Sequence, residues 1–221
     1  MAANFKPTLG KLILTFEAET DFQVDMVAGS TGKLYAQITH GAPYDIFLAA
    51  DQWRPERLIV EDHAVAGTQK TYALGRLVLW SRSDLQIGLE DLELPKVQRI
   101  AIANPNLAPY GTAARQVLQR TNVLDVVSDK LVFGENVGQA FAFVSTSNAQ
   151  VGFVAEAQIR LLPKTQSGQM VRLDPALHDP IAQDAVLLRR GSDNPAAEAF
   201  MTFLHSPKAQ DIIARHGYDL P

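Results

Sequence analysis

The chain has 221 residues, of which 47% are hydrophobic and 20% are charged, and its formal net charge is −4 at pH 7. This composition suits a globular protein with one large domain or two lobes of about 100 residues each. The negative charge, without a cluster of Lys and Arg, argues against nucleic acid as a partner. No apolar run approaches the roughly 20 residues of a membrane span. The lack of cysteine excludes disulfides, thiol catalysis and cysteine-ligated metals.

Helix-like and strand-like patterns alternate through the first part of the chain. Residues 5–17 place Leu9, Leu12 and Phe16 on one face of a predicted helix. The elements expected after this helix are a strand at 22–27, a helix at 31–40, a strand at 44–51, a short helix at 54–63 and a strand-like run at 71–80. This alternation is the order of elements in an α/β protein.

The alternation continues to the end of the chain. The elements expected there are strands at 99–105, 130–134, 151–159 and 182–191, and helices at 111–121 and 137–144. Asn194-Pro195 and Ser206-Pro207 each place a capping residue before a proline at the first helical position, so two further helices are predicted. The last helix, at 207–216, is expected to end at Gly217, because glycine is favoured just past a helix end.

The order of elements predicts two α/β lobes rather than one. Alternating strands and helices indicate doubly wound, mostly parallel sheets. Two long strand-like runs, at 71–80 and 182–191, bracket a middle section with its own alternation. We therefore expect two lobes that are joined by two crossing segments. The expected lobes are residues 1–78 with 184–221, and residues 79–183.

Small polar residues at 28–32 (AGSTG) stand between a strand-like run and a helix, where phosphate loops and nucleophilic serines occur. A phosphate loop ending at Gly32-Lys33 would need glycine at 27 and serine or threonine at 34, but the chain has Val27 and Leu34. The stretch is one residue from the G-x-S-x-G pattern of serine hydrolases, with Ser30 as the nucleophile. Such hydrolases need several strands before the serine, and only 29 residues precede it. The candidate histidine partners of Ser30 in such a hydrolase are His178, His205 and His216.

Similar turns open other helices. They are Ala2-Ala3-Asn4, Pro109-Tyr110-Gly111-Thr112 and Glu135-Asn136-Val137-Gly138. A helix cap is a sufficient explanation for any one of them. Helix N-termini also expose unpaired N–H groups at the positive end of the helix dipole, so several that converge would hold an anion. Two of the turns fall in each expected lobe, which indicates an anion bound between the lobes.

Several stretches together resemble the periplasmic molybdate-binding proteins, the substrate-binding components of molybdate ABC transporters. They are AANF (2–5), GSTGKLYAQITHGAPYDIFLAAD (29–51), TYALGRLVLWS (71–81), IAIANPNLAPYGTAARQVL (100–118), ENVGQAFAFV (135–144), AQVGFVAEAQI (149–159) and SPKAQDIIARHGYDLP (206–221). The resemblance covers nearly the whole chain. It implies the two-lobed type II periplasmic-binding fold, with a two-stranded hinge near 78–81 and 180–184.

The resemblance also implies how the anion is held. Neutral N–H and O–H groups bind a tetrahedral dianion between the lobes, without a cofactor and without metal-ligating side chains. The matching positions are Ala3 and Asn4 (through the Asn4 side chain), Ser30 and Thr31 (through the Thr31 hydroxyl), Tyr110, and Val137 through its backbone N–H. Alternatively, Asn4 and Thr31 are plain caps, Tyr110 packs the lobe and Val137 is a core residue. Carboxylates would repel a dianion, so Asp25, Asp51 and Glu135 are expected to be surface or capping groups.

One departure concerns the start of the chain. The family has a short apolar strand before its AAN-like turn, whereas this sequence opens at Met1-Ala2-Ala3. That strand is central in the family's sheet. We therefore expect the strand, and the leader peptide of a periplasmic protein, to be encoded upstream of Met1.

The predicted activity is capture rather than chemistry. We expect a periplasmic monomer that binds molybdate and tungstate and delivers the anion to an ABC permease, with cavity size separating these ions from sulfate. Neutral donors would favour a fully deprotonated anion. Two alternatives stay open at this point: a serine hydrolase that uses Ser30, and a cytoplasmic sensor domain for a small oxyanion with the same fold.

Overall fold

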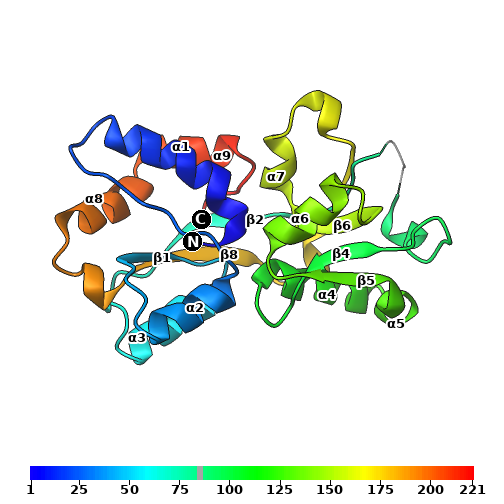
Figure 1. The fold of residues 1–221 in the computed structure, drawn as a ribbon, viewed down its shortest axis with the longest axis horizontal. Coiled ribbons are helices and arrows are strands. Elements are labelled where there is room, and N and C mark those ends of the chain that lie inside the picture. Colours follow the sequence, from blue (N-terminus) through cyan, green and yellow to red (C-terminus); the bar gives the residue numbers. More distant parts are fainter. Residues whose placement is uncertain (84–86) are drawn as a thin grey trace. The chain divides into compact units, whose positions relative to one another are not determined.

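The chain forms two compact α/β units. The structure is a computed structural model that describes residues 1–83 and 87–221. Unit 1 consists of Met1–Gly75 with Ala182–Pro221, and unit 2 of Arg76–Ile181. The two crossings, at 75/76 and 181/182, lie a few residues before the boundaries expected at 78/79 and 183/184. Figure 1 follows the chain by colour from one unit to the other and back.

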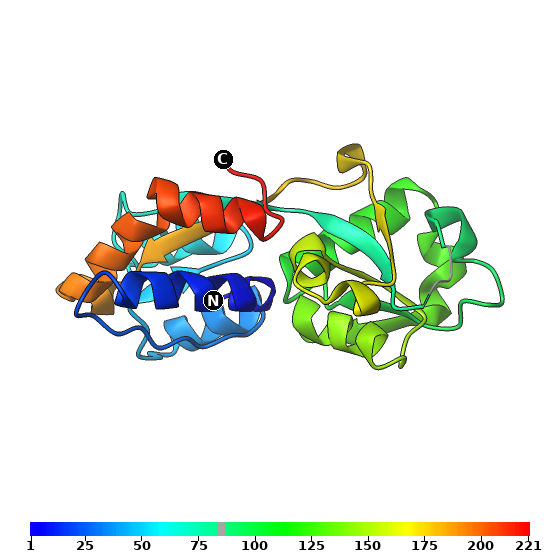
Figure 2. The ribbon, with the colours of Figure 1, turned by 90° about the horizontal axis from the view of Figure 1, so that it is seen from above.

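Unit 1 is built on a three-stranded sheet with helices on both faces. The strands are β1 (Ile46–Leu48), β8 (Ile181–Leu187) and β2 (Lys70–Gly75), in the order β1-β8-β2. The helices are α1 (Lys6–Glu17), α2 (Thr31–Thr39), α3 (Trp53–Val60), α8 (Pro195–Leu204) and α9 (Pro207–Arg215), with the 3-10 turn η1 (Ala3–Phe5) ahead of α1. Helices α1, α8 and α9 pack together, and α2 packs with α3 on the other face of the sheet (Figures 1 and 2).

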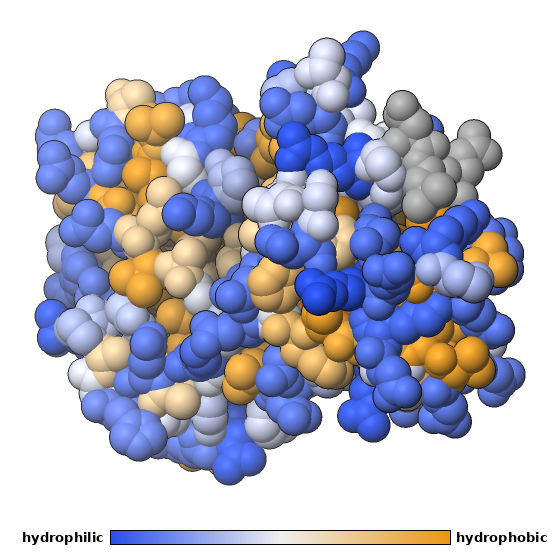
Figure 3. All heavy atoms as spheres, turned by 45° about the vertical axis from the view of Figure 1, so that its right-hand side comes forward, coloured by the Kyte–Doolittle hydropathy of each residue, from blue (hydrophilic) through white to orange (hydrophobic). Residues whose placement is uncertain are grey.

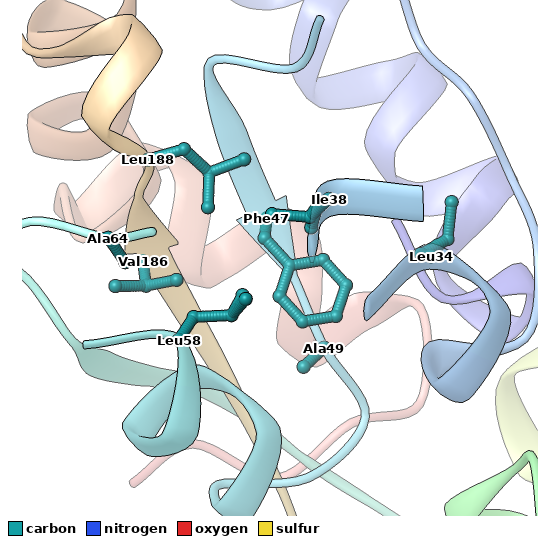
Figure 4. Packing of buried hydrophobic residues seen from close by; sticks show 8 residues of the cluster. All are labelled: Leu34, Ile38, Phe47, Ala49, Leu58, Ala64, Val186 and Leu188. Atoms are coloured by element: carbon teal, nitrogen blue, oxygen red, sulfur yellow. The ribbon is translucent and has the colours of Figure 1, made fainter. Parts of the chain in front are cut away.

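Alternating residues of β1 and β8 build the core beneath α2 and α3. Phe47 and Val186 are paired across the two antiparallel strands. They pack with Leu34 and Ile38 of α2 and with Leu58 of α3 (Figure 4). The nine residues of α2 repeat their apolar positions at helical spacing, which turns Leu34 and Ile38 toward the sheet. This core fixes the start of α2 beside the end of β1.

Unit 2 has a larger sheet. Its strands are β3 (Leu77–Ser81), β4 (Ile100–Ala103), β5 (Leu131–Gly134), β6 (Val151–Ala155) and β7 (Gln169–Arg172), in the order β5-β4-β6-β3-β7. β4 pairs in parallel with β5 and β6, whereas β3 pairs antiparallel with β6 and β7. The helices are α4 (Pro109–Arg120), α5 (Leu124–Val127), α6 (Val137–Ser145) and α7 (Glu156–Arg160). Every residue of β3, β4 and β6 is buried, as expected for central strands covered on both faces.

Two expected strands are wrong, and a third, at 151–159, ends at Ala155, because residues 156–159 belong to α7. Residues 22–27 belong to neither sheet, and their backbone groups bond to the Glu17 side chain and to the Met1 amino group instead of to a strand. The Val24 N–H donates to Glu17 Oε1 at 2.9 Å, and the Val27 carbonyl accepts from the Met1 amino group. The run at 71–80 is two strands, β2 and β3, which are divided by the crossing at 75/76. An apolar run alone does not reveal such a division.

Side chains on the surface are mixed in character. Figure 3 shows hydrophobic residues in separate groups between hydrophilic ones on the face that it draws. Val60 and Leu14 are examples of large apolar side chains exposed on helices of unit 1, and isolated examples of this kind are normal for globular proteins. None of the helices described in residues 1–83 and 87–221 combines the length and apolar character needed to cross a bilayer.

Candidate functional site

The first helix-start turn of unit 1 is fixed by backbone hydrogen bonds. The Ala3 N–H donates to the Gly29 carbonyl at 3.0 Å, and the Phe5 N–H donates to the Ala2 carbonyl at 3.1 Å. Ala2 also forms an isolated parallel bridge with Gly29, the residue just before the second turn. The structure therefore brings the two predicted turns of unit 1 side by side, and it already engages the N–H of Ala3.

Asn4 is held by a buried network of neutral groups. Its Nδ2 donates to Gln183 Oε1 at 2.9 Å and to the Tyr218 hydroxyl at 3.1 Å, and that hydroxyl donates to the Asn4 carbonyl at 3.0 Å. The Tyr72 hydroxyl reaches the same Gln183 oxygen at 3.3 Å. Burial raises the pKa of Tyr218 and of Tyr72 far above neutrality, so both stay protonated. The network therefore contributes no charge.

One atom of Asn4 is left without a partner. Its Oδ1 is buried and accepts no hydrogen bond from the described residues. A buried acceptor without a donor is unfavourable by about 1–3 kcal/mol, and such atoms often mark a functional position. The sequence analysis singled out Asn4 but not its partners Gln183 and Tyr218, which lie 179 and 214 residues away along the chain. No local pattern links residues so far apart.

The second turn of unit 1 presents two buried hydroxyls. Ser30 is the N-cap of α2, and its Oγ accepts from the Lys33 N–H at 3.3 Å. Thr31 is the first residue of that helix, and its Oγ1 accepts from the Ala50 N–H at 3.2 Å. A hydroxyl that accepts one hydrogen bond still has its own hydrogen to donate. Both side chains are therefore fixed in place by their oxygen while they keep an O–H donor.

The two predicted turns of unit 2 also meet at one edge of a sheet. Helix α4 follows β4 and contains Tyr110 as its second residue, and α6 follows β5 and begins at Val137. β4 and β5 are parallel neighbours, and the Asn104 N–H donates to the Gly134 carbonyl at 2.7 Å where both strands end. The carboxyl ends of parallel strands are where ligands bind in open α/β sheets.

A glycine permits the close packing of this edge. A Cβ atom on Gly111 would lie 2.2 Å from the Ala103 carbonyl oxygen, so only glycine lets α4 start this close to β4. At the other turn, Asn136 Oδ1 accepts from the Gln139 N–H at 3.0 Å and caps α6. The side chains of Tyr110 and Val137 are both buried. For the anion contact that the sequence analysis predicts, this burial leaves the tyrosine hydroxyl and the backbone groups as candidates.

The three carboxylates lie where the sequence analysis expected them. Asp25 and Glu135 are exposed. Asp51 Oδ1 accepts from the Arg54 N–H at 3.1 Å at the start of α3, and its other oxygen pairs with the Arg54 guanidinium. Burial raises the pKa of Asp51, while Arg54 opposes that rise. Asp51 is therefore a capping group with its own cation.

The geometry gives no support to a serine hydrolase. Ser30 Oγ bonds to a backbone amide, whereas the His205 and His216 rings face the Met201 carbonyl and Thr8 Oγ1. The third candidate, His178, contacts the Asp179 carbonyl in unit 2. Within the described part of the chain, none of the three histidines bonds to Ser30, and no group of His, Asp and Glu could hold a metal ion.

Comparison with known proteins shows the family to which the chain belongs. Residues 1–219 match the family described as bacterial extracellular solute-binding protein. The chain is 42% identical to molybdate-binding protein ModA of Azotobacter vinelandii over 222 residues, covering 100% of this chain and 88% of that protein. It is 41% identical to ModA of Rhodobacter capsulatus over 219 residues, covering 99% of this chain and 86% of the other.

Solved structures give the same result for the fold. The periplasmic molybdate-binding protein of Azotobacter vinelandii superposes with a TM-score of 0.95 at 38% identity, covering 100% of this chain and 97% of that one. The sulfate-binding protein SubI of Mycobacterium tuberculosis superposes with a TM-score of 0.81 at 17% identity, covering 99% of this chain and 84% of that one. The second likeness concerns the fold alone. The α/β fold of the type II periplasmic-binding class is thereby confirmed.

Proposed function

Because the chain belongs to the molybdate-binding members of the bacterial extracellular solute-binding family, we propose that it captures molybdate and delivers it to an ABC importer. One observation carries the proposal: each unit gathers two helix-start turns at one place, and neutral donors line them. The anion binds between the units and is contacted by turns from both. The proposed donors are Asn4, Ser30, Thr31, Tyr110 and Val137, while Ala3 holds the first turn in shape.

Neutral donors suit a fully deprotonated oxyanion. The oxygens of Ser30 and Thr31 already accept hydrogen bonds from Lys33 N–H and Ala50 N–H, so each hydroxyl turns its hydrogen outward. A backbone N–H such as that of Val137 can only donate. A protonated anion would therefore bring a hydrogen to a site that offers it few acceptors. Molybdate and tungstate are dianions at neutral pH, and a closed site sized for them would hold the smaller sulfate with longer and weaker hydrogen bonds.

Asn4 joins this site by turning its carboxamide. In the described conformation both Nδ2 hydrogens point at Gln183 and Tyr218, and Oδ1 is unpaired. A half-turn about the Cβ–Cγ bond exchanges Oδ1 with Nδ2 and converts the unpaired acceptor into a donor for the anion. Gln183 turns with it, so that its Nε2 donates to Asn4 Oδ1. With the anion bound, each polar atom of the Asn4 carboxamide thus has a hydrogen-bond partner.

Titration calorimetry tests the proposal at its broadest. We expect molybdate and tungstate to bind with one anion per chain, and sulfate and phosphate to bind far more weakly. The preference for the two larger ions follows from size, and the weak binding of phosphate follows from its proton at neutral pH. Absence of heat with molybdate, or equal affinity for sulfate, would overturn the proposal.

The proposal also includes the setting in which the protein acts. We propose that it works in the periplasm as a monomer and that an ABC permease receives the anion from it.

A substitution at Val137 tests a single donor. Val137 is the first residue of α6, a position where proline is well tolerated, and Asn136 has the extended backbone that precedes proline (φ −148°, ψ 171°). Val137→Pro therefore removes the N–H and leaves the helix intact. A hydrogen bond to a charged group contributes about 1.5–3 kcal/mol, so we expect roughly 10- to 150-fold weaker molybdate binding.

Val137→Ala is the matched control, because it removes buried side-chain atoms but keeps the N–H. If the proposal holds, the alanine variant loses stability yet binds molybdate close to the wild-type affinity. If both variants lose affinity equally, packing rather than the N–H accounts for the effect. If neither loses affinity, the assignment of this donor is wrong.

A further inference from the structure

The edge of the unit 2 sheet that carries Tyr110 and Val137 also carries a group of charged side chains. β6 runs parallel to β4, so its carboxyl end, where α7 begins at Glu156, lies at the same edge as the starts of α4 and α6. A side chain of α7 also reaches the start of α6, because Gln158 Nε2 donates to the Val137 carbonyl at 3.4 Å. The charges around Glu156 are therefore neighbours of a proposed anion donor.

Three arginines surround the Glu156 carboxylate. Arg76 immediately precedes β3, and its carbonyl accepts from the Glu156 N–H at 3.0 Å. Arg172 is the last residue of β7, and it lies at this edge because β7 runs antiparallel to β3. Arg160 follows Glu156 by one turn of α7. We call these four residues the arginine cluster. It is positively charged, whereas the chain as a whole has a net charge of −4.

The arginines exceed what one carboxylate needs. Arg160 Nε and Arg172 Nη2 both donate to Glu156 Oε1, at 2.7 and 2.9 Å. Glu156 Oε2 accepts no hydrogen bond from the described residues, and Arg76 Nη1 lies 3.6 Å from it. A single arginine can bond both oxygens of a carboxylate. The three arginine side chains are 39–60% exposed, so the surplus positive charge faces solvent.

The arginine cluster lies close enough to the proposed donors of unit 2 for its charge to act there. Neighbouring strands are about 4.8 Å apart, and β6 is one strand from β4 and two strands from β5. The starts of α4 and α6 are therefore about 5–10 Å from the end of β6. This distance is within about one Debye length at 0.1 M salt. A neutral hydrogen-bond donor, by contrast, acts only at contact distance.

From these observations we propose that the arginine cluster attracts the oxyanion to unit 2 and speeds its association, without contacting the ion once it is bound. The inference rests on the proposed function, because it concerns the capture of the same anion. Charges beside a binding site raise the association rate constant and have little effect on dissociation. The exposed Glu135 carboxylate, at the turn before α6, would repel a dianion. The surplus charge of the cluster offsets this repulsion.

Stopped-flow fluorescence with molybdate tests the proposal through two variants that change the charge in opposite directions. Arg172→Gln removes one positive charge and leaves Arg160 bonded to Glu156 Oε1. For a dianion about 10 Å away in water, the association rate constant should fall about threefold at 10 mM salt. Glu156→Gln removes the negative charge of the cluster. It should raise the association rate constant by a similar factor, although it lowers stability.

Salt and a matched variant supply the controls. Both changes in the association rate constant should vanish at 1 M salt, where the Debye length is about 3 Å, and the dissociation rate constants should stay within about twofold of wild type. Arg99→Gln makes the same charge change as Arg172→Gln. Arg99 immediately precedes β4, so it lies at the opposite edge of the same sheet, and its substitution should have a smaller effect.

The opposite signs separate attraction from a merely structural role. If the cluster only holds unit 2 together, both Arg172→Gln and Glu156→Gln should weaken binding, and the effect should persist at 1 M salt. That result, or unchanged association rate constants at 10 mM salt, would overturn the inference while wild-type binding remains. Failure of the wild type to bind molybdate would overturn the proposed function itself, so the two failures are distinguishable.

Discussion

The two units hold their helix-start turns by different means. In unit 2, the turns before α4 and α6 follow two parallel neighbouring strands of a five-stranded sheet, β4 and the edge strand β5. In unit 1, the turns at Asn4 and Ser30 are joined by one isolated bridge, and side chains from the far end of the sequence hold Asn4. Unit 2 therefore positions its proposed backbone donor through its fold, whereas unit 1 positions its proposed side-chain donors through hydrogen bonds to those side chains.

This difference predicts different responses to mutation. A change to the framework of unit 2 should damage folding and binding together. A change to a donor of unit 1 should damage binding more than folding, because each side chain is one member of a network on an otherwise intact helix start. Four substitutions, ordered by the size of their expected effect, test this contrast.

The largest effect is expected from Gly111→Ala in unit 2. The added Cβ would lie 2.2 Å from the Ala103 carbonyl oxygen, and the contact is with backbone that cannot turn aside. Overpacking of this kind is destabilising by about 3 kcal/mol. We expect the urea midpoint to fall and molybdate binding to weaken with it, because the start of α4 must shift. A variant that binds and unfolds like the wild type would show that the edge is not tightly packed.

Thr31→Val tests the side-chain donors of unit 1. It replaces the hydroxyl by a methyl group of similar size, so the anion loses a charge-assisted hydrogen bond of about 2 kcal/mol, equivalent to roughly 30-fold in affinity. The Ala50 N–H also loses its acceptor, which should lower stability by about 1 kcal/mol. Titration with molybdate measures the first effect and urea unfolding the second. Thr31→Ser keeps the hydroxyl and should restore most of the affinity.

Glu156→Gln tests a buried ion cluster of unit 2. The Glu156 carboxylate is fully buried and accepts from Arg160 at 2.7 Å and from Arg172 at 2.9 Å. Burial alone would raise its pKa, but the two arginines outweigh burial and lower it below the ordinary 4.5. Since the arginines are about half exposed, we expect the glutamine variant to lose only about 1–2 kcal/mol of stability at pH 7.

The same carboxylate gives a pH dependence with a defined sign. A lowered pKa in the folded state adds stability that is fully present above pH 4.5 and is lost as the pH falls through the folded value. Urea unfolding at pH 7, 5 and 3 measures the difference in the free energy of unfolding between wild type and Glu156→Gln. This difference should become smaller only in acid. A difference that stays constant from pH 7 to 3 would contradict the ion-pair explanation.

The smallest effect, of opposite sign, is expected from Gly10→Ala in unit 1. Gly10 lies inside α1, and a Cβ there would lie 3.6 Å from Met26 Cε, which is an ordinary contact. Replacing glycine in a helix interior by alanine should raise stability by about 0.5–1 kcal/mol. Compared with Gly111→Ala, the same substitution changes sign between the units. A loss of stability at Gly10 would show that α1 is packed more tightly than its neighbours indicate.

Patterns among neighbouring residues were sufficient to predict much of the fold. Asn194 Oδ1 and Ser206 Oγ cap α8 and α9 as their sequence pattern predicts, and Gly217 has a φ of +97° just past the last helix. Ser30 also caps its helix as expected. These features depend on residues a few positions apart, where spacing alone determines which groups can bond.

Features that depend on distant partners escaped prediction. Segment 22–27 has a strand-like pattern, but whether it joins a sheet depends on what lies beside it in space, and Met1 and Glu17 lie there instead. The orientation of Asn4 is set by Gln183 and Tyr218 from the other end of unit 1. The assignment of donors to the anion stays a prediction, since it concerns groups from both units.

Anomalous X-ray scattering from crystals grown with molybdate tests the central claim most directly. If neutral donors from both units hold the anion, the map will contain one strong molybdenum peak within about 5 Å of both Thr31 Oγ1 and the Val137 nitrogen, the distance set by one Mo–O bond and one hydrogen bond. A peak beside arginine or lysine side chains instead, or a molybdenum site touched by one unit only, would contradict it.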